Sequence, residues 1–167
     1  MDTEQAITLV EYNQWANHRL ILKAARLPHD QLIAVTYLSR GSIFATLIHI
    51  LDTQWYWREG AQYENLPTQT LSSSDFIDLA SLRKRWKQED QSLLEYVRGL
   101  SAADLRDSVT YRWPQARPRS RPLWHILQHI INHSTHHRSE IGQHLATLGQ
   151  SPGDLDFIKF VSRASHS

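Results

Sequence analysis

Six histidines fall within one stretch of this chain, residues 121–149, and imidazole is a side chain that both binds metals and transfers protons. His133 and His137 are four residues apart, which places them one turn apart on one face of a helix. His144 lies seven residues beyond His137. That is roughly 10 Å along a helix axis, too far to share an ion whose bonds to nitrogen are about 2.1 Å. The spacing therefore favours His133 and His137 as a pair of metal ligands.

The histidine-rich stretch also has a simpler explanation. On a helical wheel His125, His129 and His136 fall on the polar side, and the other three histidines fall at the inner border of the apolar stripe. Such a helix could be a solvated polar face with border histidines that only pack. A motif as short as His-x3-His does not separate this alternative from a metal site.

The element that must carry these histidines is a helix predicted over residues 121–149. Pro122 suits the first turn, where a missing N–H costs no hydrogen bond, and Gly149 with Pro152 marks the end. Seven apolar residues form one stripe along it at about 100° per residue. These are Leu123, Leu127, Ile130, Ile131, Ile141, Leu145 and Leu148.

A second helix, predicted to open at Gly41-Ser42 and cover residues 43–60, is apolar nearly all round and should be central and buried. Its narrow polar strip contains His49. A histidine on a buried helix is often a hydrogen-bonded core residue, yet this one would supply a third imidazole to the pair above. Asp52, one turn further on, could orient His49, act as a ligand, or be an ordinary surface carboxylate.

Two further amphipathic segments complete the set of long helices. Residues 3–26 form one, with Thr3 as its cap, and residues 72–99 form the other, starting at a Ser/Asp cluster. The segment between residues 27 and 40 is expected to be a loop. Four such helices predict an all-α protein, a four-helix bundle with short extra helical turns and long connecting loops.

The remaining segments are shorter. Residues Val109 to Pro114 read as extended and β-prone. The arginines of the following loop could clamp an anionic ligand beside the histidines or could simply be solvated; they are Arg112, Arg117, Arg119 and Arg121. A short terminal helix over 154–161 is expected to dock on the core through Phe157, Ile158 and Phe160.

Composition limits the functions that the chain could have. Its 167 residues, 41% of them hydrophobic, fit one domain over 1–167, and the net charge of +1 predicts no nucleic-acid partner. No apolar run reaches membrane-spanning length and the polar start is unlike a signal peptide, so we expect no membrane partner and a cytoplasmic protein. Without cysteine, any thiol must come with another molecule. Six tryptophans are more than a small core hides, which favours a homodimer.

Four stretches of the chain resemble one known family. They are Tyr12–Asn17, Leu47–Leu51 with Trp55–Trp57, Arg121–Arg138 and Gly149–Phe157. The chain is similar along nearly its whole length to the DinB-like (damage-inducible, YfiT-related) family of small helical metalloproteins. The resemblance implies a bundle that binds one divalent metal through His49, His133 and His137. Zinc is the expected ion, with nickel, iron or manganese as alternatives.

The resemblance also implies a function. Some relatives use the metal to activate a low-molecular-weight thiol, so we expect a metal-dependent, thiol-transferase-like enzyme acting on a small molecule. A metal-dependent hydrolase, or a non-enzymatic stress protein that binds a metal or small ligand, is the alternative. The family usually continues His-Arg-Gly-Gln, whereas this chain has Ser139 and Glu140 after Arg138. Glu140 and Arg138 are the candidate catalytic residues.

Overall fold

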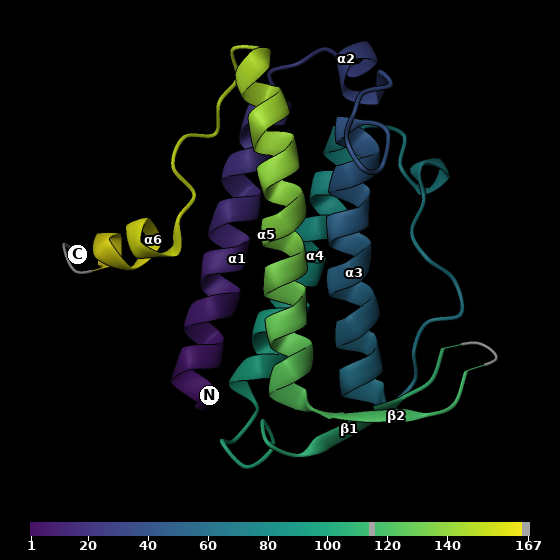
Figure 1. Cartoon of the computed structure of the whole chain (residues 1–167), viewed down its shortest axis with the longest axis vertical. Helices are drawn as coiled ribbons and strands as arrows, with labels where there is room; N and C mark the ends of the chain where they lie inside the picture. The colour runs from purple at the N-terminus through teal and green to yellow at the C-terminus, as the bar shows by residue number, and fades with distance from the viewer. Residues whose placement is uncertain (114–115, 165–167) are drawn as a thin grey trace.

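The computed structural model describes residues 1–113 and 116–164, with side chains as far as residue 162. Its long helices form a bundle (Figure 1), which consists of α1 (Thr3–Ala24), α3 (Ile43–Tyr63), α4 (Leu79–Arg98) and α5 (Leu123–Thr147). The shorter helices are α2 (His29–Ile33), the 3₁₀ turn η1 (Ser73–Asp75) and α6 (Phe157–Ala164). The predicted all-α fold with a four-helix bundle is therefore confirmed.

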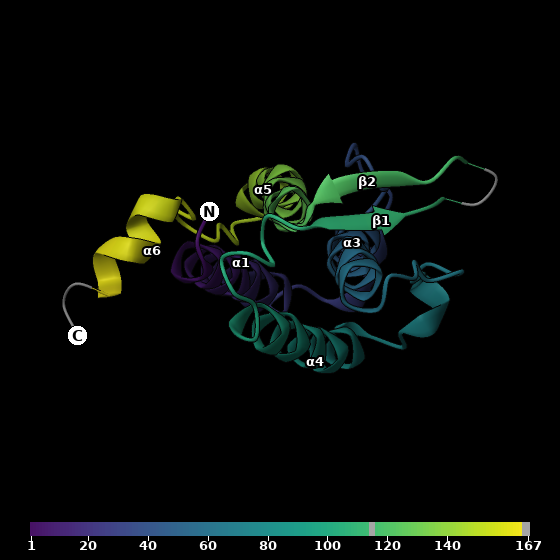
Figure 2. The same ribbon diagram turned by 90° about the horizontal axis from the view of Figure 1, so that it is seen from below.

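The four long helices form a ring in which α1 and α3 each contact both α4 and α5. In the view of Figure 1 the chain runs upward in α1 and α5 and downward in α3 and α4. Residues 64–78 carry the chain back from the lower end of α3 to the upper end of α4, so these two helices are parallel. This long crossover makes α3 and α5 antiparallel neighbours, seen end-on in Figure 2.

The first residue capping α1 is an aspartate rather than the predicted threonine. Asp2, not Thr3, caps α1: its carboxylate accepts a hydrogen bond of 2.8 Å from the Gln5 N–H, and the Gln5 side chain accepts one from the Asp2 N–H. The Thr3 hydroxyl instead donates to the Leu100 carbonyl at 3.0 Å. The reciprocal bonds between Asp2 and Gln5 satisfy backbone donors that a helix start leaves free.

The third long helix starts later than predicted. Its cap is Asp78, whose carboxylate accepts from the Ser81 N–H at 2.8 Å, and the Ser/Asp cluster before it forms only η1. The predicted loop after α1 was also only partly right, because it contains α2. Its exposed His29 places its ring edge-on against Phe44, with 5.8 Å between the ring centroids.

A β-hairpin closes the lower end of the bundle between α3 and α5. The predicted extended segment forms β1 (Ser108–Tyr111), and Pro114 lies outside the described residues. The arginine-rich loop contains an unpredicted strand, β2 (Arg119–Pro122), which pairs antiparallel with β1. As a result α5 begins at Leu123, two residues later than predicted, and β1 lies against α3 while β2 lies against α5 (Figure 2).

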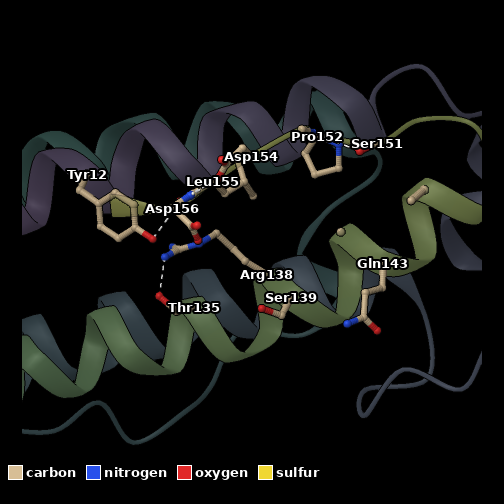
Figure 3. Close-up of a pocket in the computed structure, with 13 residues that line it drawn as sticks. Tyr12, Thr135, Arg138, Ser139, Gln143, Ser151, Pro152, Asp154, Leu155 and Asp156 are labelled. Atoms are coloured by element: carbon tan, nitrogen blue, oxygen red, sulfur yellow. Dashed lines mark hydrogen bonds between the residues drawn. The ribbon is translucent and has the colours of Figure 1, made fainter. Parts of the chain in front are cut away.

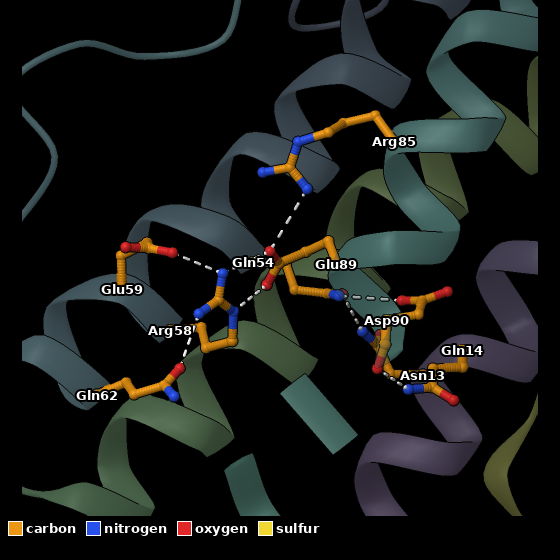
Figure 4. A network of polar contacts seen from close by, with 9 residues as sticks. All are labelled: Asn13, Gln14, Gln54, Arg58, Glu59, Gln62, Arg85, Glu89 and Asp90. Carbon is orange, nitrogen blue, oxygen red and sulfur yellow. Dashed lines mark hydrogen bonds and ion pairs between the residues drawn. The ribbon is translucent and has the colours of Figure 1, made fainter. Parts of the chain in front are cut away.

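The inside of the bundle is not wholly apolar. As predicted, α3 is central and buried, but it carries Arg58, which is only 5% exposed. Arg58 donates two hydrogen bonds, of 2.6 and 2.8 Å, to the carboxylate of the fully buried Glu89 on α4 (Figure 4). Glu59 and Gln62 accept the remaining guanidinium bonds. A buried ion pair needs this saturation, because its two charges have lost their hydration.

A chain of amides ties the four helices together near the same level. Asn13 on α1 donates to Gln54 on α3 at 3.2 Å, and Gln54 donates to the Asp90 carboxyl on α4 at 2.9 Å. Arg138 on α5 donates to the side-chain oxygen of Asn13. Burial raises the pKa of Asp90 to about 7, the Gln54 bond notwithstanding. Asn13 and Gln54 are thus part of the bundle interior.

The terminal helix α6 packs against the side of α1. Tyr12 receives the edge of Phe157 at 5.3 Å between ring centroids, and Phe160 also packs against it. Ile158 is 63% exposed, so its predicted docking on the core is wrong. Among the described helices, none combines the length and the apolarity needed to cross a membrane.

Candidate metal centre

Three histidines meet between α3 and α5. His49 comes from α3, and His133 and His137 come from successive turns of α5. Their ring centroids lie 4.8, 4.8 and 4.6 Å apart in the three pairs, and one ligand nitrogen from each lies within 4.8 Å of the others. The structure therefore brings together the three residues that the sequence selected.

The environment keeps these imidazoles neutral. Burial, with the positive charge of Arg40 and the nearby His137, lowers the pKa of His49 to about 4. Burial and the neighbouring histidines lower the pKa of His133 to about 3. Burial also lowers the pKa of His137, although Glu140 acts in the opposite direction. At neutral pH all three rings are in the form that binds a metal.

The ring nitrogens of the cluster lie close to one another. The Nε2 atoms of His49 and His133 are 2.9 Å apart, and the Thr53 hydroxyl lies 3.0 Å from the same nitrogen of His133. A neutral imidazole carries a proton on one ring nitrogen and a lone pair on the other, so each ring has one nitrogen that could bind an ion. Three neutral imidazoles are a donor set that fits zinc and similar divalent ions. These residues could hold one metal ion.

Glu140 is placed to orient His137. Its Oε2 lies 3.3 Å from Nδ1 of His137 and accepts a 2.7 Å hydrogen bond from the Ser39 hydroxyl. Burial raises the pKa of Glu140, but the hydrogen bonds from Ser39 and His137 outweigh it and leave the pKa below its usual value. A carboxylate on Nδ1 fixes the ring and leaves Nε2 for an ion. The predicted candidate thus lies beside the histidines as an orienting group.

Two residues of the loop before α3 reach the centre without any sign in the sequence. Ser39 holds Glu140, and its hydroxyl is also 3.4 Å from Nδ1 of His137. Arg40 places Nη2 2.8 Å from Nε2 of His49. Neither residue lies on a helix with ligand spacing, and only the tertiary fold brings them to the histidines.

A second group of side chains could also hold an ion, namely His136, His137 and Glu140. It shares His137 with the first group, so the two compete for one ring. His136 is exposed, and its Nε2 lies 3.2 Å from Oε1 of Glu140 along the helix surface. The three-histidine group is the better candidate because its rings are shielded and neutral.

Other candidates from the sequence lie elsewhere. The Asp52 carboxylate accepts a 2.7 Å hydrogen bond from the Leu71 N–H, so it ties down the crossover segment and does not orient His49. His144 packs edge-on against Tyr37 at 5.2 Å between ring centroids. His129 lies next to the cluster, with its ring centroid 5.5 Å from that of His133, but outside the ligand group.

Arg138 points away from the three histidines, toward α1. It is 2% exposed and donates to Asn17 at 2.8 Å and to Thr135 at 2.7 Å, as well as to Asn13. Its guanidinium lies over the Tyr12 ring, 5.4 Å from the centroid, beside a pocket of about 420 Å³ (Figure 3). In this position Arg138 holds α5 against α1, whereas the three histidines lie between α5 and α3.

A different pocket, of about 510 Å³, adjoins the histidine cluster. Thr53 and His133 form the part of its lining nearest the cluster, and aromatic residues of α3 and the hairpin form more of it. Of the four arginines that the sequence left open between an anion clamp and a solvated loop, Arg121 lines this pocket. The cluster is therefore open to a cavity of ligand size.

The protein is thus a four-helix bundle, and three histidines from two antiparallel helices form its candidate metal centre. The chain belongs to the DinB family, whose family model matches residues 1–165. A comparison with curated proteins found no match.

Proposed function

We propose that this DinB-family protein is a metal-dependent enzyme that transfers a low-molecular-weight thiol to an electrophile. The observation that carries the proposal is the group of three neutral, facing imidazoles beside an open pocket. Three histidine ligands that leave a coordination position for a substrate are typical of catalytic rather than structural zinc sites. Because the chain has no cysteine, the reacting sulfur must belong to a cosubstrate.

The proposed ligands are His49, His133 and His137, and zinc is the expected ion, with nickel, iron or manganese as alternatives. A bound divalent ion would supply a Lewis acid that lowers the pKa of a thiol bound beside it. The residues of the chain then have binding and orienting roles. Glu140 fixes the His137 ring through Nδ1.

The charges near the cluster favour an anionic cosubstrate. Arg40 lies against His49, and Arg121 lines the adjoining pocket. Small cellular thiols carry carboxylates, which arginine binds through paired hydrogen bonds. Arg138, the other candidate from the sequence, donates to Asn13, Asn17 and Thr135, and its proposed role is structural.

The test is a conjugation assay on metal-loaded protein with carboxylate-bearing thiols and 1-chloro-2,4-dinitrobenzene as the electrophile. We expect a rate at least about tenfold above the uncatalysed reaction. The His137→Ala variant and chelation should abolish it, and returning the metal should restore the wild-type rate. His136→Ala is the matched control, because it removes the neighbouring exposed histidine and should retain activity.

The outcomes separate the alternatives. Metal-dependent turnover that needs no thiol would favour the hydrolase, and stable metal binding without turnover of any thiol would favour a passive binder. Activity that survives complete metal removal would contradict the proposal. The homodimer, the cytoplasmic location and the role in stress stay predictions.

A further inference from the structure

The pocket beside the histidine cluster has the chemistry of a site for a second substrate. It runs between α3, α5 and the hairpin, with Thr53 and His133 among its lining residues. The hairpin contributes Tyr111, Trp113 and Arg121. Its volume of about 510 Å³ lies in the range of small-molecule sites.

Three aromatic rings form the apolar wall of this pocket. Trp57 on α3 meets Tyr111 and Trp113 of the hairpin edge-to-face, with 4.9 and 5.8 Å between ring centroids, and the two hairpin rings lie 5.0 Å apart. Trp57 and Trp113 are only partly buried, so part of their surface faces the cavity. Such a wall favours a flat, unsaturated ligand, because aromatic rings stack and pack edge-to-face.

The charge of the lining favours an anion. Arg121 lines the pocket, Arg119 stacks on Trp113 at 5.6 Å from the ring centroid, and no acidic side chain is among the described lining residues. His129 also lines the pocket. The cavity therefore combines an aromatic wall with an arginine and no opposing carboxylate.

We propose that this pocket binds a planar aromatic carboxylate, with the ring system against Trp57 and Trp113 and the carboxylate on Arg121. The role of this ligand as the second substrate, next to the thiol, rests on the proposed function. Its binding does not, because the pocket is built from residues outside the three proposed ligands except for His133. An experiment can therefore contradict the thiol-transfer function without contradicting the binding of an aromatic carboxylate, and the reverse.

The experiment is a titration of the full-length chain, with and without zinc, followed through the indole N–H signals of Trp57 and Trp113 in ¹⁵N NMR spectra. The probes are 2-naphthoate, the neutral 2-naphthalenemethanol and the saturated cyclohexanecarboxylate. We expect 2-naphthoate to bind about tenfold more tightly than either of the others and to shift both indole signals.

Variants locate the two halves of the site. Arg121→Gln should weaken 2-naphthoate about tenfold and leave the neutral alcohol unchanged. Arg112→Gln is the matched control, because it removes the same charge from the same hairpin at an exposed position outside the pocket lining. Trp57→Leu should weaken both aromatic probes, and Trp57→Phe should recover most of the affinity if the loss came from the ring.

Several results would overturn the inference. Equal binding of the acid and the alcohol, or equal losses in the Arg121 and Arg112 variants, would remove the role of Arg121. Binding of 2-naphthoate that requires zinc and ignores Arg121→Gln would mean that the carboxylate binds the ion. Conversely, retained binding in a protein that conjugates no thiol would contradict the proposed function and leave the aromatic-anion site intact.

Discussion

Two groups of polar side chains lie inside this bundle, and they differ in how their hydrogen-bonding atoms are matched. In the Arg58–Glu89 pair, guanidinium donors meet carboxylate acceptors at 2.6 and 2.8 Å. In the histidine cluster, atoms of the same kind face each other, with two Nε2 atoms 2.9 Å apart. Glu89 is fully buried, and the three histidines are buried or half-buried. The facing of like atoms, rather than burial alone, therefore distinguishes the candidate metal centre from the ion pair.

The first prediction, which has the largest expected effect, concerns metal binding by the histidine cluster. If the three histidines are ligands, wild-type protein should bind about one divalent ion per chain, and His133→Ala should lose nearly all of it. His129→Ala removes the next histidine along α5, outside the ligand group, and should retain the metal. Elemental analysis of the purified variants makes the measurement. The opposite result, with metal lost only in His129→Ala, would show that the ligand assignment is wrong.

Substitutions in the Arg58–Glu89 pair should instead change the free energy of unfolding. Glu89→Ala leaves the Arg58 guanidinium buried beside a single partly exposed carboxylate, which we expect to cost about 3–5 kcal/mol of unfolding free energy. Arg85→Ala is the control. It removes a longer 3.6 Å contact to Glu89 from a partly exposed position, and should cost at most about 1 kcal/mol. Urea denaturation measures both.

The metal content of the Glu89→Ala variant tests whether the ion pair and the histidine cluster are independent. Glu89→Ala protein that remains folded should bind the same amount of metal as wild type, because Glu89 and the histidines share no contact among the described side chains. A folded Glu89→Ala protein without metal would break the distinction between the two groups.

The smallest effect is a dependence on pH from Asp90. Its pKa is raised by burial to about 7, so the folded protein keeps this carboxyl protonated where the unfolded chain ionises it near 3.8. Its contribution to stability is therefore complete below about pH 4 and is lost as pH rises to about 7. Asp90→Asn cannot ionise and keeps the oxygen that Gln54 donates to.

Relative to wild type, Asp90→Asn should thus gain stability between pH 5 and pH 8, by about 2 kcal/mol. Denaturation curves for both proteins at the two pH values give the difference. A gain that is the same at both would show that Asp90 is already ionised in the folded protein at pH 5.

Helical spacing in the sequence favoured His133 and His137 as a pair, because one turn separates them. It left His49 open between a ligand and a core residue, and the resemblance to the DinB-like family implied the set of three. Glu140 was noticed because Ser139 and Glu140 replace the Gly-Gln that usually follows His-Arg in that family. Ser39 and Arg40 were missed, because they reach the cluster from a loop.

The position of Arg138 around the helix explains why its side chain does not lie at the histidine cluster. Neighbouring residues on a helix are about 100° apart, so a side chain next to a ligand in sequence points to a different face. His137 faces α3, and Arg138 reaches Asn13 and Asn17 on α1. The second strand of the hairpin was also not predicted, because an arginine-rich segment has no local preference for strand pairing.

The order of the helices along the chain has a consequence for how the protein is made. His49 and His133 are 84 residues apart, and α5 comes last of the long helices. A ribosome that adds about 5–20 residues per second has released α1, α3 and α4 seconds before His133 and His137 emerge. During that interval the nascent chain holds only one of the three histidines. The three histidines of the candidate centre can therefore come together only once α5 has joined the bundle, at or after the end of translation.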